Sequence, residues 1–306
     1  MVKIFEGLEN IEKINNPVIA IGNFDGVHRG HQALIANVIN EKNKINGTAC
    51  VITFYPHPLT VINPYIKIEQ ITPINDKLSI LEEFGIDITI LVKFDDNFSN
   101  ISAEDFVKKI IWGKLAAKVV IVGYDFSFGR NKEGDREFFK RMGKDLGFEV
   151  KVIEPVIEND IIISSTKIRS FLKEGKIKEA ENFLGRPYIL KGMVTKGKKI
   201  GRLLGFPTAN LLIIDYLIPR HGVYAAYAYL DEQKYKAVLN IGPAITFNIE
   251  QVSFEVHLLD FSGDIYGKEM VIEFVERIRG VEKFKDVEML KEQIKKDVEK
   301  ARVILK

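Results

Sequence analysis

Residues 17–31, "PVIAIGNFDGVHRGH", decide the fold of the first half of the chain. The stretch begins with an apolar run, which is typical of a buried strand, and leads into residues 31–43, where apolar side chains recur at helical spacing. Gly26 and Gly30 lie in between, where they allow a tight turn and let a ligand approach backbone N–H groups. The stretch therefore predicts a strand, a glycine-containing turn and a helix.

The same alternation continues to about residue 170. Further apolar runs lie at 48–54, 87–94, 117–123 and 148–153, and helical patterns lie at 73–84, 103–112 and 135–146. Continuous apolar strands that alternate with helices predict a Rossmann-like, doubly wound parallel sheet with helices on both faces. Ligands of such sheets bind at the turns that follow the carboxyl ends of the strands.

The pattern changes at about residue 188, where strand-like runs follow one another without helices between them. These runs are 188–195, 223–230, 234–241, 252–260 and 268–277, and one amphipathic helix over 284–304 follows them. This order predicts a small antiparallel β-barrel with a C-terminal helix. A helical pair over 171–187 is expected to end the first domain, so we predict domains of 1–185 and 186–306.

Composition narrows the class of protein. The 306 residues are 46% hydrophobic and 28% charged, and the formal net charge of +2 comes from interspersed residues, which argues against a nucleic-acid partner. The single cysteine, Cys50, lies in an apolar run and is expected to be a buried, inert thiol. We find no bilayer-length apolar stretch and no signal-peptide core, so we expect a cytoplasmic protein without a membrane partner, a monomer or weak oligomer that binds small molecules.

Two histidines, His28 and His31, lie three residues apart at the expected helix start and can point the same way. Imidazoles at the positive end of a helix can donate to a phosphate and stabilise its charge. The alternatives are a pair of capping or core histidines, or a metal site, for which no acidic or thiol third ligand is obvious nearby. The glycines and the strand-to-helix context favour phosphate.

Three other strand ends carry polar side chains. "TFYPHP", 53–58, follows the second strand, and "GYDFSFGRNKEGD", 123–135, places Asp125 among aromatic residues that are typical of a core. "ISSTKIRS", 163–170, supplies hydroxyl groups and positive charge at a helix start. It fits either a capped amphipathic helix or a second arm that holds phosphate.

Together, "GNFDGVHRGH", "TFYPHP", "VGYDFSFGRNKEGD" and "ISSTKIR" resemble the FMN adenylyltransferase domain of bacterial FAD synthetases, within the nucleotidylyltransferase superfamily. The resemblance implies that the phosphate of FMN attacks the α-phosphorus of ATP, which yields FAD and pyrophosphate without a general base. It implies catalytic roles for His28, His31 and Arg169. The implied phosphate contacts are Gly22, Asn23, Gly30, Ser164 and Thr166, and the implied flavin contacts are His57 and Asp125.

The second half has its own candidate site. "GRLLGFPTANL", 201–211, is glycine-rich but lacks the P-loop pattern. Thr208 and Asn210 would project to one side of an extended chain, and their oxygen atoms suit Mg²⁺, although an ordinary barrel loop fits as well. Glu255 alternates with apolar residues, a pattern that does not distinguish a solvated glutamate from a general base.

These segments, with "GRPYILKG", "GVYA", "NIG", "EVHLLDF" and "DIYG", resemble the riboflavin kinase family. The resemblance implies that Thr208 and Asn210 hold Mg²⁺ and ATP, and that Glu255 deprotonates the riboflavin hydroxyl that attacks the γ-phosphate. It also implies that Gly201 contacts phosphate and that Tyr224 contacts flavin. Ile245 stands where the family usually has proline, so the local loop geometry is expected to differ.

The two resemblances cover nearly the whole chain in the order of the bifunctional riboflavin kinase/FMN adenylyltransferase family. We therefore expect an enzyme that uses riboflavin, FMN and ATP, with Mg²⁺, and that produces FAD. One alternative is a nucleotidylyltransferase for another small phosphate, which leaves the second half unexplained. Another is a non-catalytic flavin or nucleotide sensor, against which the intact candidate residues argue.

Overall fold

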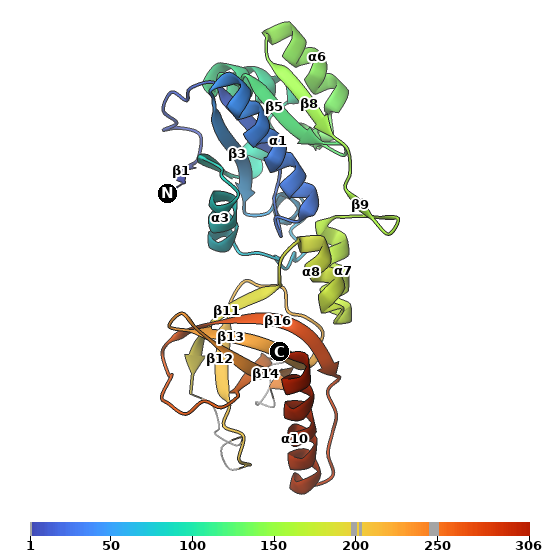
Figure 1. Ribbon diagram of the computed structural model, residues 1–306. Coiled ribbons are helices and arrows are strands. Elements are labelled where there is room, and N and C mark those ends of the chain that lie inside the picture. The colour runs from blue at the N-terminus through green and yellow to red at the C-terminus, as the bar shows by residue number, and fades with distance from the viewer. Residues whose placement is uncertain (1, 197–200, 202–203, 245–250) are drawn as a thin grey trace. The chain divides into compact units, whose positions relative to one another are not determined.

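The computed structural model describes residues 2–196, 201, 204–244 and 251–306 (Figure 1). The chain forms two compact units, Met1–Ser165 and Thr166–Lys306. The helical pair that we expected at the end of the first domain belongs by its contacts to the second unit, where the backbone N–H of Arg220 donates to the carbonyl of Leu172 (2.9 Å). The domain boundary at 185/186 stays a prediction.

The first unit contains the predicted parallel sheet. Its strands are β1 (Lys3–Glu6), β2 (Pro17–Ile21), β3 (Thr48–Tyr55), β4 (Ile88–Lys93), β5 (Val119–Gly123) and β8 (Glu149–Ile153), in the order β1-β4-β3-β2-β5-β8. Every neighbouring pair is parallel. The pattern did not reveal β1, because "KIFE" is a short, mostly exposed edge strand that β4 alone stabilises.

Helices cover both faces of this sheet. The main ones are α1 (Arg29–Ile45), α3 (Ile74–Glu83), α5 (Ala103–Asp105) with the π-helix η1 (Phe106–Lys114), and α6 (Arg136–Leu146). Buried side chains of α1 and α3 pack on one face, and those of η1 and α6 pack on the other. Local signals set the helix ends: Ser102 accepts a hydrogen bond from the backbone N–H of Asp105 (3.1 Å), and Gly147 ends α6 with φ +83°.

Shorter elements complete the first unit. They are α2 (Pro58–Ile62), α4 (Asp96–Ser99), the 3₁₀ turn η2 (Arg130–Lys132), and two small hairpins, β6 (Ser127–Phe128) with β7 (Gly134–Asp135) and β9 (Ile157–Glu158) with β10 (Ile161–Ile162). Cys50 is fully buried in the sheet, and burial raises the pKa of its thiol to about 12, so the thiol is inert as expected.

The second unit is the predicted closed antiparallel barrel. Its strands are β11 (Ile189–Thr195), β12 (Ala209–Ile213), β13 (Gly222–Leu230), β14 (Gln233–Ala244), β15 (Gln251–Leu258) and β16 (Glu269–Arg279), in the order β11-β12-β15-β14-β13-β16. The helices are α7 (Ser165–Glu174), α8 (Ile177–Leu184) and α10 (Val287–Ile304). The fold class expected for each half is thereby confirmed.

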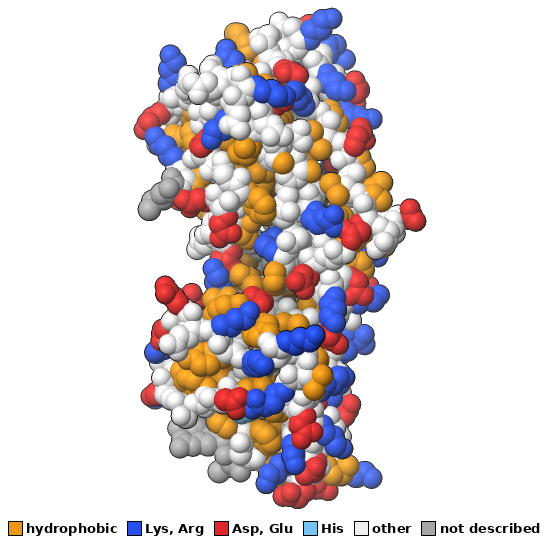
Figure 2. Space-filling view, viewed as in Figure 1, with side chains coloured by type: hydrophobic (Ala, Val, Ile, Leu, Met, Phe, Trp, Pro, Cys, Tyr) orange, Lys and Arg blue, Asp and Glu red, His pale blue; other side chains and the backbone are white. Residues whose placement is uncertain are grey.

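On the face that Figure 2 shows, lysine and arginine side chains are interspersed with aspartate and glutamate side chains over each unit. Within the described residues, every helix is too short or too polar to cross a membrane.

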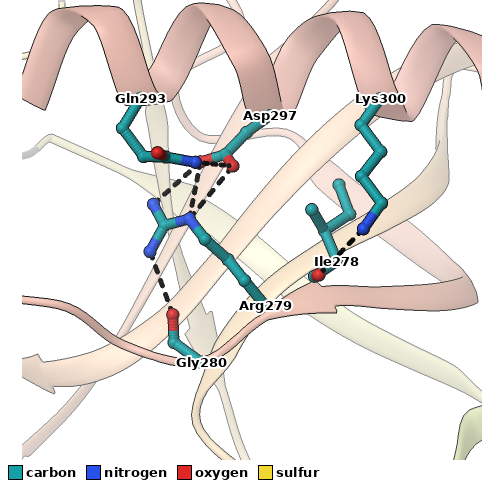
Figure 3. Close-up of polar contacts among 6 residues, drawn as sticks. All are labelled: Ile278, Arg279, Gly280, Gln293, Asp297 and Lys300. Atoms are coloured by element: carbon teal, nitrogen blue, oxygen red, sulfur yellow. Dashed lines mark hydrogen bonds and ion pairs between the residues drawn. The ribbon is translucent and has the colours of Figure 1, made fainter.

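A buried ion pair attaches α10 to the end of β16 (Figure 3). The guanidinium of Arg279 donates to both carboxylate oxygens of Asp297 at 2.8–3.0 Å, and the side-chain amide of Gln293 donates to the same carboxylate at 2.9 Å. Asp297 is only 3% exposed. Because removing one partner leaves the other charge buried and unpaired, this contact is expected to matter more than a surface pair.

We therefore predict that Asp297→Asn lowers the stability of the barrel unit by about 3 kcal/mol, because Arg279 loses its buried counter-charge. Hydrogen exchange of the β16 and α10 backbone amides in the full-length protein measures the change. The matched control is Asp260→Asn, which breaks the exposed pair between Asp260 and Arg302 of the same helix. Equal acceleration of exchange in the two variants would contradict the prediction.

Candidate active site

The first candidate site is the loop between β2 and α1. His28 is the N-cap of α1, and its Nδ1 accepts a hydrogen bond from the backbone N–H of His31 at 3.4 Å. Phe24 and Val27 have φ values of +50° and +38°, and Gly26 has +84°. Positive φ is unfavourable for residues with a Cβ, so this loop keeps its shape only because surrounding contacts hold it.

The two predicted histidines lie side by side. Their rings stack with centroids 3.7 Å apart, and His28 is only 6% exposed. Because Nδ1 of His28 accepts a hydrogen bond, the proton of its neutral ring lies on Nε2, the nitrogen that can donate to an anion. The capping role and the phosphate role are therefore compatible in the same residue.

Gly30 allows the second motif to approach the histidines. A Cβ at this position would lie 3.1 Å from the His28 ring and 3.5 Å from the carbonyl oxygen of Ile163, the residue that precedes Ser164. The hydroxyl of Ser165 also donates to the backbone carbonyl of Asp25 at 2.8 Å. The structure thus brings "GNFDGVHRGH" and "ISST" together, as the sequence motifs indicated.

Ser164 and Thr166 flank Ser165, and Arg169 lies one turn further along α7. Ser164 and Arg169 are partly buried, whereas Thr166 is exposed. Their predicted contacts with phosphate stay predictions.

Asp25 is a residue of this loop that the sequence analysis did not single out, and it attaches the loop to residues 71–72. Its buried carboxylate accepts hydrogen bonds from the backbone N–H groups of Ile71 (3.3 Å) and Thr72 (3.1 Å). No local pattern indicates this role, because residues 71–72 lie nearly fifty positions further along the chain.

Asn23 and His57 meet at the ends of β2 and β3. The side-chain amide of Asn23 lies 3.5 Å from Nε2 of His57, whose Nδ1 accepts a hydrogen bond from the backbone N–H of Leu59. The Oδ1 atom of Asn23 is buried and has no hydrogen-bond partner among the described residues. An unpaired buried oxygen of this kind is energetically costly.

Lys77 is a further residue that the sequence analysis missed. Its Nζ donates to the carbonyl of Asn23 (3.0 Å) and to the hydroxyl of Thr53 (3.1 Å). Burial lowers the pKa of Lys77 to about 8, and the Asp25 carboxylate opposes that shift, so Lys77 remains a cation at neutral pH. One sequence signal could have indicated its burial: Lys77 lies on the same helix face as the apolar residues Ile80 and Leu81.

The barrel unit brings its own candidates together. In the antiparallel register Asn210 of β12 pairs with Glu255 of β15, and Glu255 pairs on its other side with Asn240 of β14. Thr208 directly precedes β12, and Nδ1 of His257 lies 2.8 Å from the carbonyl oxygen of Pro207. The sequence analysis included Asn240 only within "NIG", and the register now places its side chain beside the two predicted ones.

Comparison with known proteins connects these two sites to chemistry. Residues 10–167 match the family model of FAD synthetase, and residues 184–305 match that of riboflavin kinase. The bifunctional riboflavin kinase/FMN adenylyltransferase of Buchnera aphidicola subsp. Schizaphis graminum is 38% identical over 303 residues, which cover 97% of each chain. The Bacillus subtilis protein of the same name is 38% identical over 291 residues, which cover 93% of this chain and 91% of its own.

The chain belongs to the bifunctional riboflavin kinase/FMN adenylyltransferase family. It carries the two activities that the sequence analysis expected, riboflavin kinase and FMN adenylyltransferase. The fold is shared with a crystal structure described as a macrolide-efflux protein from Streptococcus pneumoniae, at a TM-score of 0.92 and 32% identity, covering 98% of this chain and 99% of that one.

In this bifunctional enzyme, Tyr224 is part of the core of the barrel unit. Its ring is fully buried against Phe274 in the barrel, and its hydroxyl donates to the carbonyl of Arg220. Burial raises the pKa of this hydroxyl to about 12. Packing accounts for the residue in this structure, and its contact with flavin stays a prediction.

The remaining candidates lie near the loops where they were expected. Asp125 is exposed after β5, whereas the neighbouring Phe126 and Phe128 stack in the core with Phe139. A Cβ at Gly201 would lie 2.4 Å from the carbonyl of Phe206 and 2.9 Å from the Thr208 hydroxyl, so this glycine packs closely against the candidate site. Ile245 lies outside the described residues.

We predict that Gly30→Ala lowers the kcat/KM of FMN adenylylation by about tenfold or more, because the new Cβ displaces the His28 ring. Steady-state assays with FMN and ATP measure the loss. Riboflavin kinase activity of the same protein is expected to stay unchanged. The control Ala36→Ser adds one atom on the exposed face of α1 and should leave both activities intact; adenylylation at the wild-type rate in Gly30→Ala would show that the close contact is unimportant.

Proposed function

We propose that the barrel unit phosphorylates riboflavin to FMN with ATP, and that the parallel-sheet unit then adenylylates FMN with a second ATP to give FAD. The two family-model matches support this assignment, because each covers one of the two sites. The observation that carries it for the first unit is the stacked histidine pair at the N-terminus of α1, held beside the "ISST" segment.

In the adenylylation, an oxygen of the FMN phosphate forms a bond to the α-phosphorus of ATP. The bond from that phosphorus to its bridging oxygen breaks, and the electron pair leaves with pyrophosphate. Because the nucleophile is already an anion, the unit needs positioning and charge stabilisation rather than a base. We assign this work to His28 and His31, which donate from the helix start.

The other candidates for adenylylation take supporting roles in this proposal. Gly22, Asn23 and Gly30 lie in or beside the loop that the phosphates approach, and Ser164, Thr166 and Arg169 are the further proposed contacts with phosphate. His57, which touches the Asn23 amide, and Asp125 are the proposed flavin contacts.

In the kinase reaction, Glu255 accepts the proton of the terminal riboflavin hydroxyl as that oxygen attacks the γ-phosphorus, and ADP leaves. A neutral hydroxyl is a poor nucleophile at neutral pH, so a base is chemically reasonable here. The pairing of Asn210, Glu255 and Asn240 on adjacent strands supports this role. Gly201 is the proposed phosphate contact and Tyr224 the proposed flavin-side residue.

Mg²⁺ fits this set of oxygen donors. Thr208 and Asn210 offer a hydroxyl and an amide oxygen, which are hard ligands, and Mg²⁺ commonly completes its shell with substrate phosphates. No cluster of three or more His, Cys, Asp or Glu side chains suited to a metal occurs in the described part of the chain. When bound, Mg²⁺ would neutralise phosphate charge, and Thr208 and Asn210 would orient it with ATP.

We also place the enzyme in the cytoplasm, where it would act on small molecules as a monomer or weak oligomer. The buried, unpaired thiol of Cys50 is compatible with a reducing compartment. An adenylylating enzyme for another small phosphate, or a flavin sensor, would leave one of the two matched domains or its candidate residues without a role.

We predict that His28→Ala and Glu255→Gln block different steps of the reaction sequence. The assay supplies riboflavin, Mg²⁺ and ATP, and the flavins are separated over time. His28→Ala should stop at FMN, since adenylylation loses a charge-stabilising donor and falls by about 10²-fold or more. Glu255→Gln should lower FMN formation by about 10²- to 10⁴-fold yet convert supplied FMN to FAD.

His221→Ala and Glu269→Gln, which change an exposed histidine and an exposed glutamate of the barrel unit, serve as matched controls and should form FAD normally. If either site variant abolished both steps while remaining folded, the division of labour would be wrong. Absence of any flavin turnover by the folded wild-type protein would refute the proposed function.

A further inference from the structure

Lys77 is a buried cation, which is energetically unfavourable, and the proposed chemistry gives it no role. It lies in the first turns of α3, its side chain faces inward beside Ile80 and Leu81, and it is only 7% exposed. Burial penalises an ammonium group, and a positive charge near a helix N-terminus is also unfavourable. The structure must therefore supply specific contacts that hold this cation.

The side-chain hydrogen bonds of Lys77 lead to the proposed adenylylation site. Its Nζ donates to the carbonyl of Asn23 and to the hydroxyl of Thr53, and that hydroxyl in turn donates to the same Asn23 carbonyl at 3.1 Å. Asp25 is close enough to stabilise the ammonium electrostatically. The cation thus lies between the end of β3 and the β2–α1 loop.

The loop that Lys77 contacts is the strained one. Asn23 immediately precedes Phe24, whose φ is +50°. The segment that carries Lys77 also holds Asp25, through the backbone N–H groups of Ile71 and Thr72. One stretch of chain, residues 71–77, therefore fixes the loop at two positions. A strained backbone conformation of this kind persists only where several surrounding contacts hold it.

We propose that Lys77 is a positioning residue for adenylyl transfer: its buried ammonium fixes the Asn23 carbonyl, and thereby holds the loop that presents the Asn23 amide and His28 to the phosphates of ATP. Lys77 acts through the loop and does not itself touch substrate. The positive charge of Lys77 close to the loop also favours the binding of an anionic ligand there. The inference rests on the proposed function of this loop.

The test compares Lys77→Met, Thr53→Val and the double variant in steady-state adenylylation of supplied FMN. Lys77→Met should lower kcat by about 30-fold and leave the KM for FMN within about twofold, because a displaced loop impairs the transition state more than flavin binding. Thr53→Val, which preserves side-chain shape, should give a smaller loss. The double variant should be no worse than Lys77→Met, since both changes break one network.

Two internal controls test whether the loss is specific to adenylylation and to Lys77. Riboflavin kinase activity of each variant should equal that of the wild type, because the barrel unit is unchanged. Lys42→Met, which removes a lysine that pairs with Asp87 at the other end of α1, should adenylylate FMN normally. If Lys77→Met does not fold, Thr53→Val decides: a lowered kcat supports the inference and a wild-type kcat overturns it.

The outcomes also distinguish this inference from the proposed function. Wild-type kcat in folded Lys77→Met, together with loss of adenylylation in His28→Ala, would overturn the role of Lys77 alone. Wild-type adenylylation in both variants would overturn the assignment of the loop itself. Strictly additive losses from Lys77→Met and Thr53→Val would show that the two residues do not act through the shared Asn23 carbonyl.

Discussion

The conformation of the β2–α1 loop is the constraint on which the adenylylation site depends. The loop must turn from a buried strand into a helix within a few residues, and it does so with positive φ at Phe24 and Val27. Such a backbone is stable only under contacts from outside the loop, which come from the backbone N–H groups of Ile71 and Thr72, from Ser165 and from Lys77. These contacts hold the start of α1, where the two imidazoles stack at the place proposed for an anion.

The two units meet different chemical demands with different residues. In the proposed chemistry, an FMN phosphate arrives ionised, so donors and a helix N-terminus in the parallel-sheet unit suffice and no base is needed. A riboflavin hydroxyl arrives neutral, so the proposal requires a carboxylate in the barrel, beside the proposed oxygen ligands of Mg²⁺ and ATP. The antiparallel register supplies that arrangement, since it places Glu255 directly between Asn210 and Asn240.

The sequence was sufficient to predict those features of the fold that depend on a local pattern of residues. Apolar runs and helical spacing located the long strands and helices, and the glycines around His28 predicted the tight turn between β2 and α1. The features that it did not reveal depend on distant partners. Among the described strands, β1 pairs only with β4, and β12 forms between β11 and β15. Asp25 and Asn23 of the loop bind Thr72 and Lys77, which lie about fifty positions further along the chain. In the sequence, Lys77 looks like any lysine of an amphipathic helix. Only the folded structure shows that its side chain binds the carbonyl of Asn23.

The most direct test of the central claim is a crystal structure of the chain with FMN and α,β-methylene-ATP, an analogue that cannot undergo adenylyl transfer. The account predicts the triphosphate at the start of α1 in the parallel-sheet unit, with Nε2 of His28 within hydrogen-bond distance, about 3 Å, of a phosphate oxygen. A triphosphate bound in that unit away from His28 and His31, or no nucleotide there at saturating concentration, would contradict it.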